Sequence, residues 1–115
     1  MSVTIYHNPR CTKSRQTLAL LEKHGIQPKV IEYLVTPPTE VELKRLIKLL
    51  GMTPRELVRK KEEEFKKAKL DTTNVTDAEI IRAMVKYPRL MERPIVVTSN
   101  KAALGRPPEN VLKIL

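Results

Sequence analysis

Cys11 is the one cysteine in the sequence, and its neighbours suit a reactive thiol better than a buried structural one. It lies in the segment Tyr6-His7-Asn8-Pro9-Arg10-Cys11-Thr12-Lys13-Ser14-Arg15, between a short β-branched run and a leucine-rich stretch. This pattern predicts a cysteine at the N-terminus of a helix, where the helix dipole and free N–H groups favour the thiolate. Because Arg10, Lys13 and Arg15 add positive charge, the sequence predicts that Cys11 is a nucleophile.

Two neighbours of Cys11 are candidates for tuning its thiol. Ser14 stands where a Cys-x-x-Cys oxidoreductase has its second cysteine, so its hydroxyl could hydrogen-bond the thiolate but cannot resolve a mixed disulfide. His7 could donate a hydrogen bond towards the thiolate or orient the loop. Since the chain has no other thiol, an adduct on Cys11 must be resolved by an external thiol such as glutathione or a glutaredoxin.

Three arginines far from Cys11 in sequence are candidates for binding an anion. Arg59 lies in a segment predicted to be mostly helical, just before a charged run, and Arg93 and Arg106 each precede a proline. A guanidinium presents a rigid fork of donors that suits tetrahedral oxyanions, and it stays charged. Any one of these arginines alone would be interpreted as a solvated surface residue.

The composition predicts one ordered domain with an anionic partner. The chain has 115 residues, 41% of them hydrophobic, and a net charge of +9 from 22 basic and 13 acidic residues. The chain has one Phe and no Trp, so few aromatic side chains are available to stack on nucleic-acid bases. No specific nucleic acid is therefore expected as partner. We expect a small oxyanion instead, and predict neither a metal site nor a bound cofactor.

The single cysteine also bears on where the protein works. It excludes an internal disulfide, which favours a reducing compartment. The N-terminal residues lack a basic segment followed by an apolar one, and no apolar run approaches the ~20 residues that span a bilayer. We therefore expect a cytoplasmic protein with no membrane partner.

The hydrophobic pattern before residue 88 predicts a β-α-β unit followed by helices. Strands are predicted over residues 3–6 and 29–33, with a helix over 12–24 between them. After Pro37-Pro38, three Thr-x-x-Glu capping boxes predict three helices; they begin at Thr39, Thr53 and Thr76. Residues 62–70 are charged and predict either a continued helix or a connecting loop, and the role of residues 60–70 stays open.

The last part of the chain predicts a return to β-structure. Residues 95–98 and 101–104 form a predicted hairpin, and residues 109–115 a short amphipathic helix. The order β-α-β … β-β-α predicts an α/β fold with a thioredoxin/glutaredoxin-like mixed sheet. Residues 1–115 form a single domain in this interpretation, with a helical insertion of about residues 39–87 between the second and third strands. Cys11 is then expected at a carboxyl edge of the sheet, where ligands of open α/β sheets bind.

Taken together, these residues closely resemble the glutaredoxin-coupled arsenate reductase family, including its short housekeeping relatives. The resemblance extends over about residues 3–112, and its motifs are specific only in combination. They are Tyr6-His7-Asn8-Pro9-Arg10-Cys11-x-x-Ser14-Arg15, Tyr33-Leu34 with Pro37-Pro38, Leu57-Val58-Arg59-Lys60, Arg93-Pro94-Ile95-Val96-Val97 and Gly105-Arg106-Pro107.

The resemblance implies a reaction and a role for each candidate residue. Cys11 would attack the arsenic of arsenate, His7 would tune the thiol, and three arginines would bind the oxyanion, namely Arg59, Arg93 and Arg106. Glutathione would be the co-substrate that attacks the adduct, and glutaredoxin would complete the reduction to arsenite. A cis peptide at Arg93-Pro94 is also implied. The sequence departs from some members at Gly105, where they carry a cysteine.

Two other functions remain open at this stage. The short relatives of the family share the cysteine and the arginines, so a glutathione-dependent thiol reductase of unknown substrate fits the same residues. A redox-responsive transcription regulator that binds RNA polymerase fits less well. Such regulators use Cys-x-x-Cys at this position, whereas this chain has Ser14.

Overall fold

The computed structural model describes residues 2–72 and 74–115, which form two compact units. The first unit consists of the chain up to Thr36 together with Arg93–Leu115, and the second is Pro37–Glu92. The description of residues 1–115 as a single domain stays a prediction. Candidate residues of the site are divided between the units, because Arg59 belongs to the second and the others to the first.

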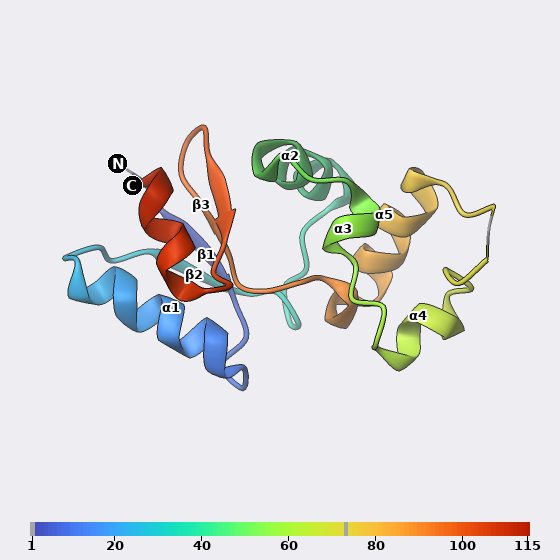
Figure 1. The fold of residues 1–115 in the computed structure, drawn as a ribbon, viewed down its shortest axis with the longest axis horizontal. Coiled ribbons are helices and arrows are strands. Elements are labelled where there is room, and N and C mark those ends of the chain that lie inside the picture. Colours follow the sequence, from blue (N-terminus) through green and yellow to red (C-terminus); the bar gives the residue numbers. More distant parts are fainter. Residues whose placement is uncertain (1, 73) are drawn as a thin grey trace. The chain divides into compact units, whose positions relative to one another are not determined.

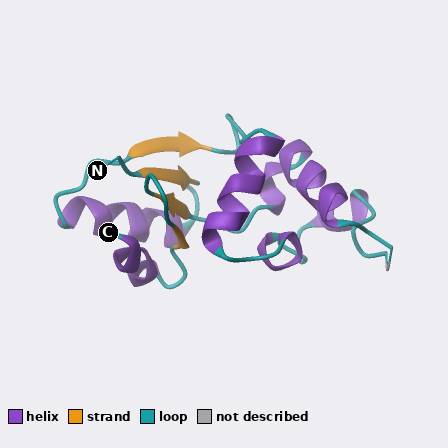
Figure 2. Cartoon of the chain, turned by 90° about the horizontal axis from the view of Figure 1, so that it is seen from above, coloured by secondary structure: helices purple, strands orange, loops and turns teal. Residues whose placement is uncertain are grey.

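A four-stranded mixed sheet forms the centre of the first unit (Figures 1 and 2). Its strands are β1 (Thr4–His7), β2 (Lys29–Glu32), β3 (Ile95–Val97) and β4 (Ala102–Leu104), in the order β2-β1-β3-β4. β1 pairs in parallel with β2 and antiparallel with β3, and β3 forms an antiparallel hairpin with β4. The predicted α/β class with a mixed sheet is therefore confirmed.

Two helical segments pack side by side in the first unit (Figure 1). They are α1 (Thr12–Lys23) and the 3-10 helix η2 (Pro108–Ile114). The core between them and the sheet is apolar and closed to solvent; its buried members are Val3, Ile5, Leu21, Val96 and Val111. The C-terminal segment is a 3-10 helix because its bonds span three residues, as in Asn110 N–H to the Pro107 carbonyl at 3.0 Å.

The second unit is helical, as the capping boxes predict. It contains α2 (Glu40–Leu50), α3 (Pro54–Leu57), α4 (Glu63–Lys67), α5 (Asp77–Lys86) and the 3-10 helix η1 (Pro88–Leu90). In all three boxes the threonine side chain accepts from the N3 N–H and the glutamate accepts from the N-cap N–H. The local pairing thus fixes where α2, α3 and α5 begin.

The helix predicted before Arg59 is present but ends at Leu57, so Arg59 lies outside it instead of in a helical segment. Val58 forms an antiparallel bridge with Met91, and Arg59 N–H donates to the Leu90 carbonyl at 2.7 Å. These bonds replace the ones that would continue α3. After a break, residues 60–70 include the short helix α4 rather than one long helix or a loop alone. Among the described residues, no helix is long and apolar enough to span a membrane.

Candidate active site

Cys11 is the N-cap residue of α1, as its sequence neighbours predict. Its backbone is extended (φ −95°, ψ 124°), and its carbonyl accepts the Arg15 N–H at 3.0 Å, the first hydrogen bond of the helix. An N-cap position is normally taken by Ser, Thr, Asp or Asn, whose side-chain oxygen accepts a main-chain N–H of the first turn. Here a sulfur takes that place, so the open N–H groups of α1 face a thiol instead of an oxygen.

The loop between β1 and Cys11 is fixed by hydrogen bonds to its own main chain. The Asn8 side chain accepts the Arg10 N–H at 3.0 Å, and the Asn8 carbonyl accepts the Cys11 N–H at 3.0 Å. Arg15 donates from Nη1 to the Pro9 carbonyl at 2.9 Å. The sequence interpretation assigned Arg15 only a charge and gave Asn8 no role. The Asn-Pro pair, which favours turns closed by the asparagine side chain, was the available signal.

The surroundings of Cys11 favour its thiolate. Burial acts to raise the pKa of the Cys11 thiol, but it is outweighed by groups that lower the pKa. These are the main-chain N–H groups of Ser14 and Lys13 together with the Arg93 guanidinium, which acts both by its charge and as a hydrogen-bond donor. The net pKa of Cys11 is below its ordinary value, as a nucleophilic thiol requires.

Ser14 and His7 form a buried pair beside the cysteine. The hydroxyl of Ser14 lies 2.7 Å from His7 Nδ1 and accepts the Asn8 N–H at 2.9 Å. The expectation was that the Ser14 hydroxyl bonds the Cys11 thiolate. Instead, the main-chain N–H of Ser14 acts on the sulfur. His7 is the last residue of β1 rather than part of the turn, and it orients the loop through Ser14.

The imidazole of His7 is held towards its neutral form. Burial lowers the pKa of His7, the carboxylate of Glu32 opposes this by raising the pKa, and the charge of Arg15 lowers it further. The net pKa lies below the ordinary value for histidine. A neutral imidazole protonated on Nε2 can accept the Ser14 O–H at Nδ1, so the pair is satisfied without adding a buried charge.

Arg93 and Arg106 meet within the first unit. Nη1 of Arg106 donates to the Arg93 carbonyl at 3.2 Å, and the Gly105 N–H donates to the Pro94 carbonyl at 3.0 Å. The peptide bond Arg93-Pro94 is cis, as the family resemblance implied, and Arg106-Pro107 is also cis. The structure thus brings Cys11, His7, Ser14, Arg93 and Arg106 into one unit.

Arg59 is paired with carboxylates in the second unit. Its Nη1 lies 2.7 Å from Glu62 and its Nε 3.7 Å from Glu92. Glu62 also bonds Arg89 at 3.2 Å, so one carboxylate serves two guanidinium groups. Arg59 stays a predicted member of the anion site.

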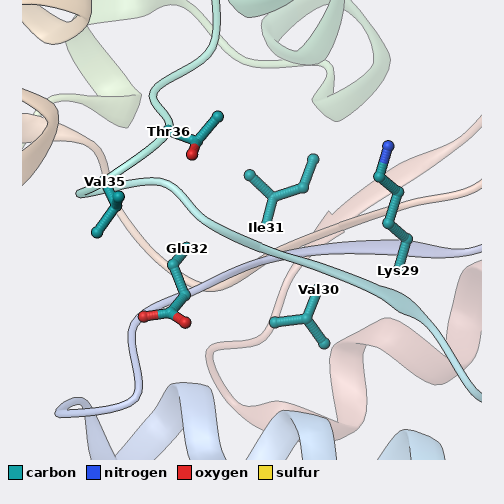
Figure 3. A pocket seen from close by; sticks show the side chains of 6 residues that line it. All are labelled: Lys29, Val30, Ile31, Glu32, Val35 and Thr36. Carbon is teal, nitrogen blue, oxygen red and sulfur yellow. The ribbon is translucent and has the colours of Figure 1, made fainter.

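A pocket of about 430 Å³ lies along β2, the strand whose Glu32 pairs with His7 of β1 (Figure 3). Its lining is Lys29, Val30, Ile31, Glu32, Val35 and Thr36, with Lys29 and Ile31 on one side of the strand and Val30 and Glu32 on the other. None of these is a predicted site residue. Across residues 2–72 and 74–115, no group of three His, Cys, Asp or Glu side chains could hold a metal ion.

The fold and the activated cysteine define a class of thioredoxin-like proteins, and comparison with known proteins gives the family. The model of the ArsC family matches residues 6–114, so this chain belongs to the ArsC family. It is 52% identical over 114 residues to the "Uncharacterized protein YfgD" of Escherichia coli K12, covering 98% of this chain and 96% of that protein. It is 48% identical over 116 residues to the arsenate reductase of Haemophilus influenzae, covering 100% of both.

Solved structures agree with this membership. The arsenate reductase from Vibrio cholerae superposes with a TM-score of 0.96 at 53% identity, covering 100% of this chain and 98% of that one. A superposition this close over the whole chain supports the assignment of the fold to the ArsC type of thioredoxin-like protein. The recognised family and fold are therefore confirmed.

Proposed function

We propose that this protein reduces arsenate to arsenite, with Cys11 as the nucleophile and an external thiol as the source of electrons. The observation that carries the proposal is the position of Cys11 as N-cap of α1, where the N–H groups of Ser14 and Lys13 and the guanidinium of Arg93 act on its sulfur and lower its pKa. A thiolate and an arsenate dianion repel each other, so a site that joins them needs fixed positive charge. The N–H groups of the first turn and the guanidinium of Arg93 supply this charge.

The proposed reaction has two chemical stages. In the first, the Cys11 sulfur attacks arsenic(V), an As–O bond breaks, and the oxygen leaves as water after protonation. In the second, an external thiolate attacks the Cys11 sulfur and the electron pair of the S–As bond passes to arsenic. Arsenite leaves with arsenic(III), and the two sulfurs form a disulfide. A second thiol then exchanges with that disulfide and restores Cys11.

The external thiols in this proposal are glutathione and then glutaredoxin, both available in a reducing cytoplasm. With Ser14 at the Cys-x-x-Ser position and no second cysteine, the chain cannot resolve the disulfide by itself. Arg93 and Arg106 bind the oxyanion in the first unit, and we assign Arg59 to the same task. Support for the substrate comes from the arsenate reductases of about the same length among the relatives.

A steady-state assay with arsenate, glutathione and glutaredoxin tests the proposal. We expect turnover by the wild-type protein, none by Cys11→Ser, and near wild-type turnover by Gln16→Ala, an exposed residue of the same helix. Leaving out either thiol component should stop multiple turnovers. The arsenate assignment fails if the wild-type protein shows no turnover and Cys11→Ser does not change arsenate tolerance in cells.

A second candidate is a glutathione-dependent thiol reductase acting on another substrate. The observation that supports this candidate is the Cys11 thiolate with Ser14 in place of a second cysteine, an arrangement that suits exchange with an external thiol. The same Cys11 thiolate would then attack a mixed disulfide instead of arsenic. Turnover of a glutathione mixed disulfide, without turnover of arsenate, would favour this candidate over the first.

A further inference from the structure

Two cations next to Cys11 in the sequence, Arg10 and Lys13, have no task in the proposed attack on arsenic. Both residues are exposed, whereas Cys11 is buried. Their main chains are fixed, because the Arg10 N–H donates to Asn8 Oδ1 at 3.0 Å and the Lys13 N–H acts on the Cys11 sulfur. The two side chains therefore start from the solvent-facing surface of the turn that carries the thiol.

The charges of Arg10 and Lys13 are not used inside the protein. Within the part of the chain that the structure describes, neither side chain forms an ion pair or donates a hydrogen bond. Arg15 differs, because it donates to the Pro9 carbonyl at 2.9 Å and to Thr12 Oγ1 at 3.3 Å. The charges of Arg10 and Lys13 thus remain available to an anion from solvent.

The place of these cations is electrostatically unfavourable for the protein alone. A helix N-terminus carries partial positive charge, so its first turn favours Asp or Glu. The first turn of α1 instead holds Lys13, and Arg10 directly precedes the N-cap. The side-chain charge that lowers the pKa of Cys11 comes from Arg93, so making the thiolate does not account for the other two cations. Binding of an external anion would offset the repulsion.

The second stage of the proposed reaction brings such an anion to Cys11. Glutathione carries two carboxylates and one ammonium group, so it is negatively charged at neutral pH. Its sulfur forms a bond to the Cys11 sulfur, the S–As bond breaks, and the electron pair of that bond passes to arsenic, which leaves as arsenite. Because Arg93 and Arg106 hold the oxyanion in this proposal, the carboxylates of glutathione need other cations.

We propose that Arg10 and Lys13 are binding residues for glutathione, whose carboxylates they hold while its sulfur attacks the adduct on Cys11. The inference rests on the proposed function, which supplies glutathione as the reductant. It divides the cations of the first unit into two sets: Arg93 and Arg106 for the oxyanion, and Arg10 and Lys13 for the thiol. Since a positively charged thiol is repelled by Arg10 and Lys13, the pair selects among thiols by charge.

Disulfide exchange with probes of different charge tests the proposal without arsenate. The Cys11 thiolate attacks one sulfur of glutathione disulfide, a Cys11–glutathione disulfide forms, and a glutathione thiolate leaves. Cystamine is the cationic probe and 2-hydroxyethyl disulfide the neutral one. For the double variant Arg10→Gln/Lys13→Gln at physiological ionic strength, we expect exchange with glutathione disulfide to slow about fivefold or more. Exchange with cystamine should become faster, and exchange with the neutral probe should not change.

Two further measurements separate binding of glutathione from an effect on the thiol or on the oxyanion site. The pH profile of alkylation by neutral iodoacetamide should match that of the wild type, because the N–H groups and Arg93 act on the thiol. The sulfate concentration that half-protects Cys11 from this alkylation should stay within about twofold, since sulfate is held by Arg93 and Arg106. A shifted profile, or sulfate protection lost as strongly as the exchange rate, would overturn the proposal.

Lys23→Gln is the matched control. Lys23 is an exposed cation in the last turn of α1, so this variant removes one charge from the same helix. The helical rise places it about 15 Å from Lys13, beyond the Debye length of about 8 Å at physiological ionic strength. We expect the wild-type rate with each probe. If Lys23→Gln slows exchange with glutathione disulfide as much as Lys13→Gln does, the effect is one of net charge and the proposal is wrong.

The wild-type protein gives a second test that needs no variant. Its preference for glutathione disulfide over cystamine should fall as the ionic strength rises towards about 1 M, where the Debye length is about 3 Å. A preference that does not depend on salt would contradict the proposal.

The outcomes also separate this inference from the proposed function. If the wild-type protein does not turn over arsenate but the double variant loses its preference for glutathione disulfide, the arsenate assignment fails and the binding role of Arg10 and Lys13 stands. If the wild-type protein turns over arsenate and the double variant keeps the wild-type preference, the proposed function stands and the binding role fails.

Discussion

The Nδ1 atom of His7 lies 2.7 Å from the hydroxyl oxygen of Ser14, and both side chains are buried. Through this bond the end of β1 is tied to the first turn of α1, across the loop that carries Cys11. The histidine therefore contacts the residue whose main-chain N–H acts on the thiol. The N–H of Ser14, which lowers the pKa of Cys11, belongs to the residue so held.

Ser14→Ala is expected to destabilise the protein and to make the Cys11 thiol less reactive. It leaves buried His7 Nδ1 and the Asn8 N–H without their Ser14 partner, which costs about 1–3 kcal/mol. With the turn released, the Ser14 N–H is less well held, so the Cys11 pKa should rise towards its ordinary value. Urea unfolding and the pH profile of iodoacetamide alkylation measure the two effects. Gln16→Ala, exposed on the same helix, should change neither. An alkylation profile in Ser14→Ala that equals the wild-type profile would contradict the role given to the hydroxyl.

Arg93→Gln and Arg106→Gln should separate two roles of arginine. Arg93 lowers the pKa of Cys11 directly, whereas the side chain of Arg106 bonds the Arg93 carbonyl. We expect Arg93→Gln to slow alkylation at neutral pH several-fold and Arg106→Gln to change it less. Both should weaken sulfate protection about tenfold to a hundredfold, because hydrogen bonds to charged groups contribute about 1.5–3 kcal/mol.

Arg93→Lys keeps the charge but loses the fork of donors. It should therefore keep most of the alkylation rate while losing sulfate protection. Equal effects of Arg93→Gln and Arg106→Gln on the alkylation profile would contradict the division of roles. So would an Arg93→Lys variant that binds sulfate as the wild type does.

The lowered pKa of Cys11 predicts a pH dependence of stability. The folded thiol ionises below the value of the unfolded chain, about 8.5, so between the two values the unfolded chain binds more protons. The free energy of unfolding should rise with pH across this window, with the contribution complete above about 8.5 and lost as the pH falls through the folded value. The free energy of unfolding is measured against pH for the wild type and for Cys11→Ser. The difference between the two curves removes the contribution of His7, which is present in both. A difference that stays flat with pH would count against a stabilised thiolate.

Glu62→Gln tests whether the carboxylate near Arg59 competes with an anion. Glu62 lies 2.7 Å from Arg59, and removing its charge leaves the guanidinium with Glu92 at 3.7 Å. We expect sulfate protection of Cys11 to strengthen several-fold, most strongly at low salt. Glu64→Gln is the control, because Glu64 bonds Arg89 instead. Weaker protection in Glu62→Gln would mean that the carboxylate orients Arg59, and no change would remove Arg59 from the anion site.

Features with short-range causes were predictable from the sequence. The three capping boxes join residues three positions apart, so Thr39, Thr53 and Thr76 mark helix starts without knowledge of the fold. Cys11 as N-cap follows in the same way from the change of pattern between β1 and α1. The mixed sheet was predictable from the order of its elements, because a β-α-β unit makes β1 and β2 parallel.

Features with long-range causes were not predictable in this way. Arg59 is extended because its segment pairs with residues 90–92, which nothing near Arg59 in the sequence indicates. The contact of Thr17 with Gly105 joins residues 88 positions apart. The partner of the Ser14 hydroxyl depends on which way β1 presents His7. In each case the residue can be identified from the sequence, but its partner in the folded chain cannot.

The order of the elements along the chain determines when Arg93 can act on the thiol during synthesis. β3 occupies an inner position of the sheet, between β1 and β4, although it is made near the end of the chain. A nascent chain that ends before Arg93 can form the β-α-β unit but has no guanidinium of Arg93 to act on Cys11. The emerging protein thus has the N–H groups of Ser14 and Lys13 at the Cys11 sulfur first, and the charge of Arg93 is added only when the last strands pair.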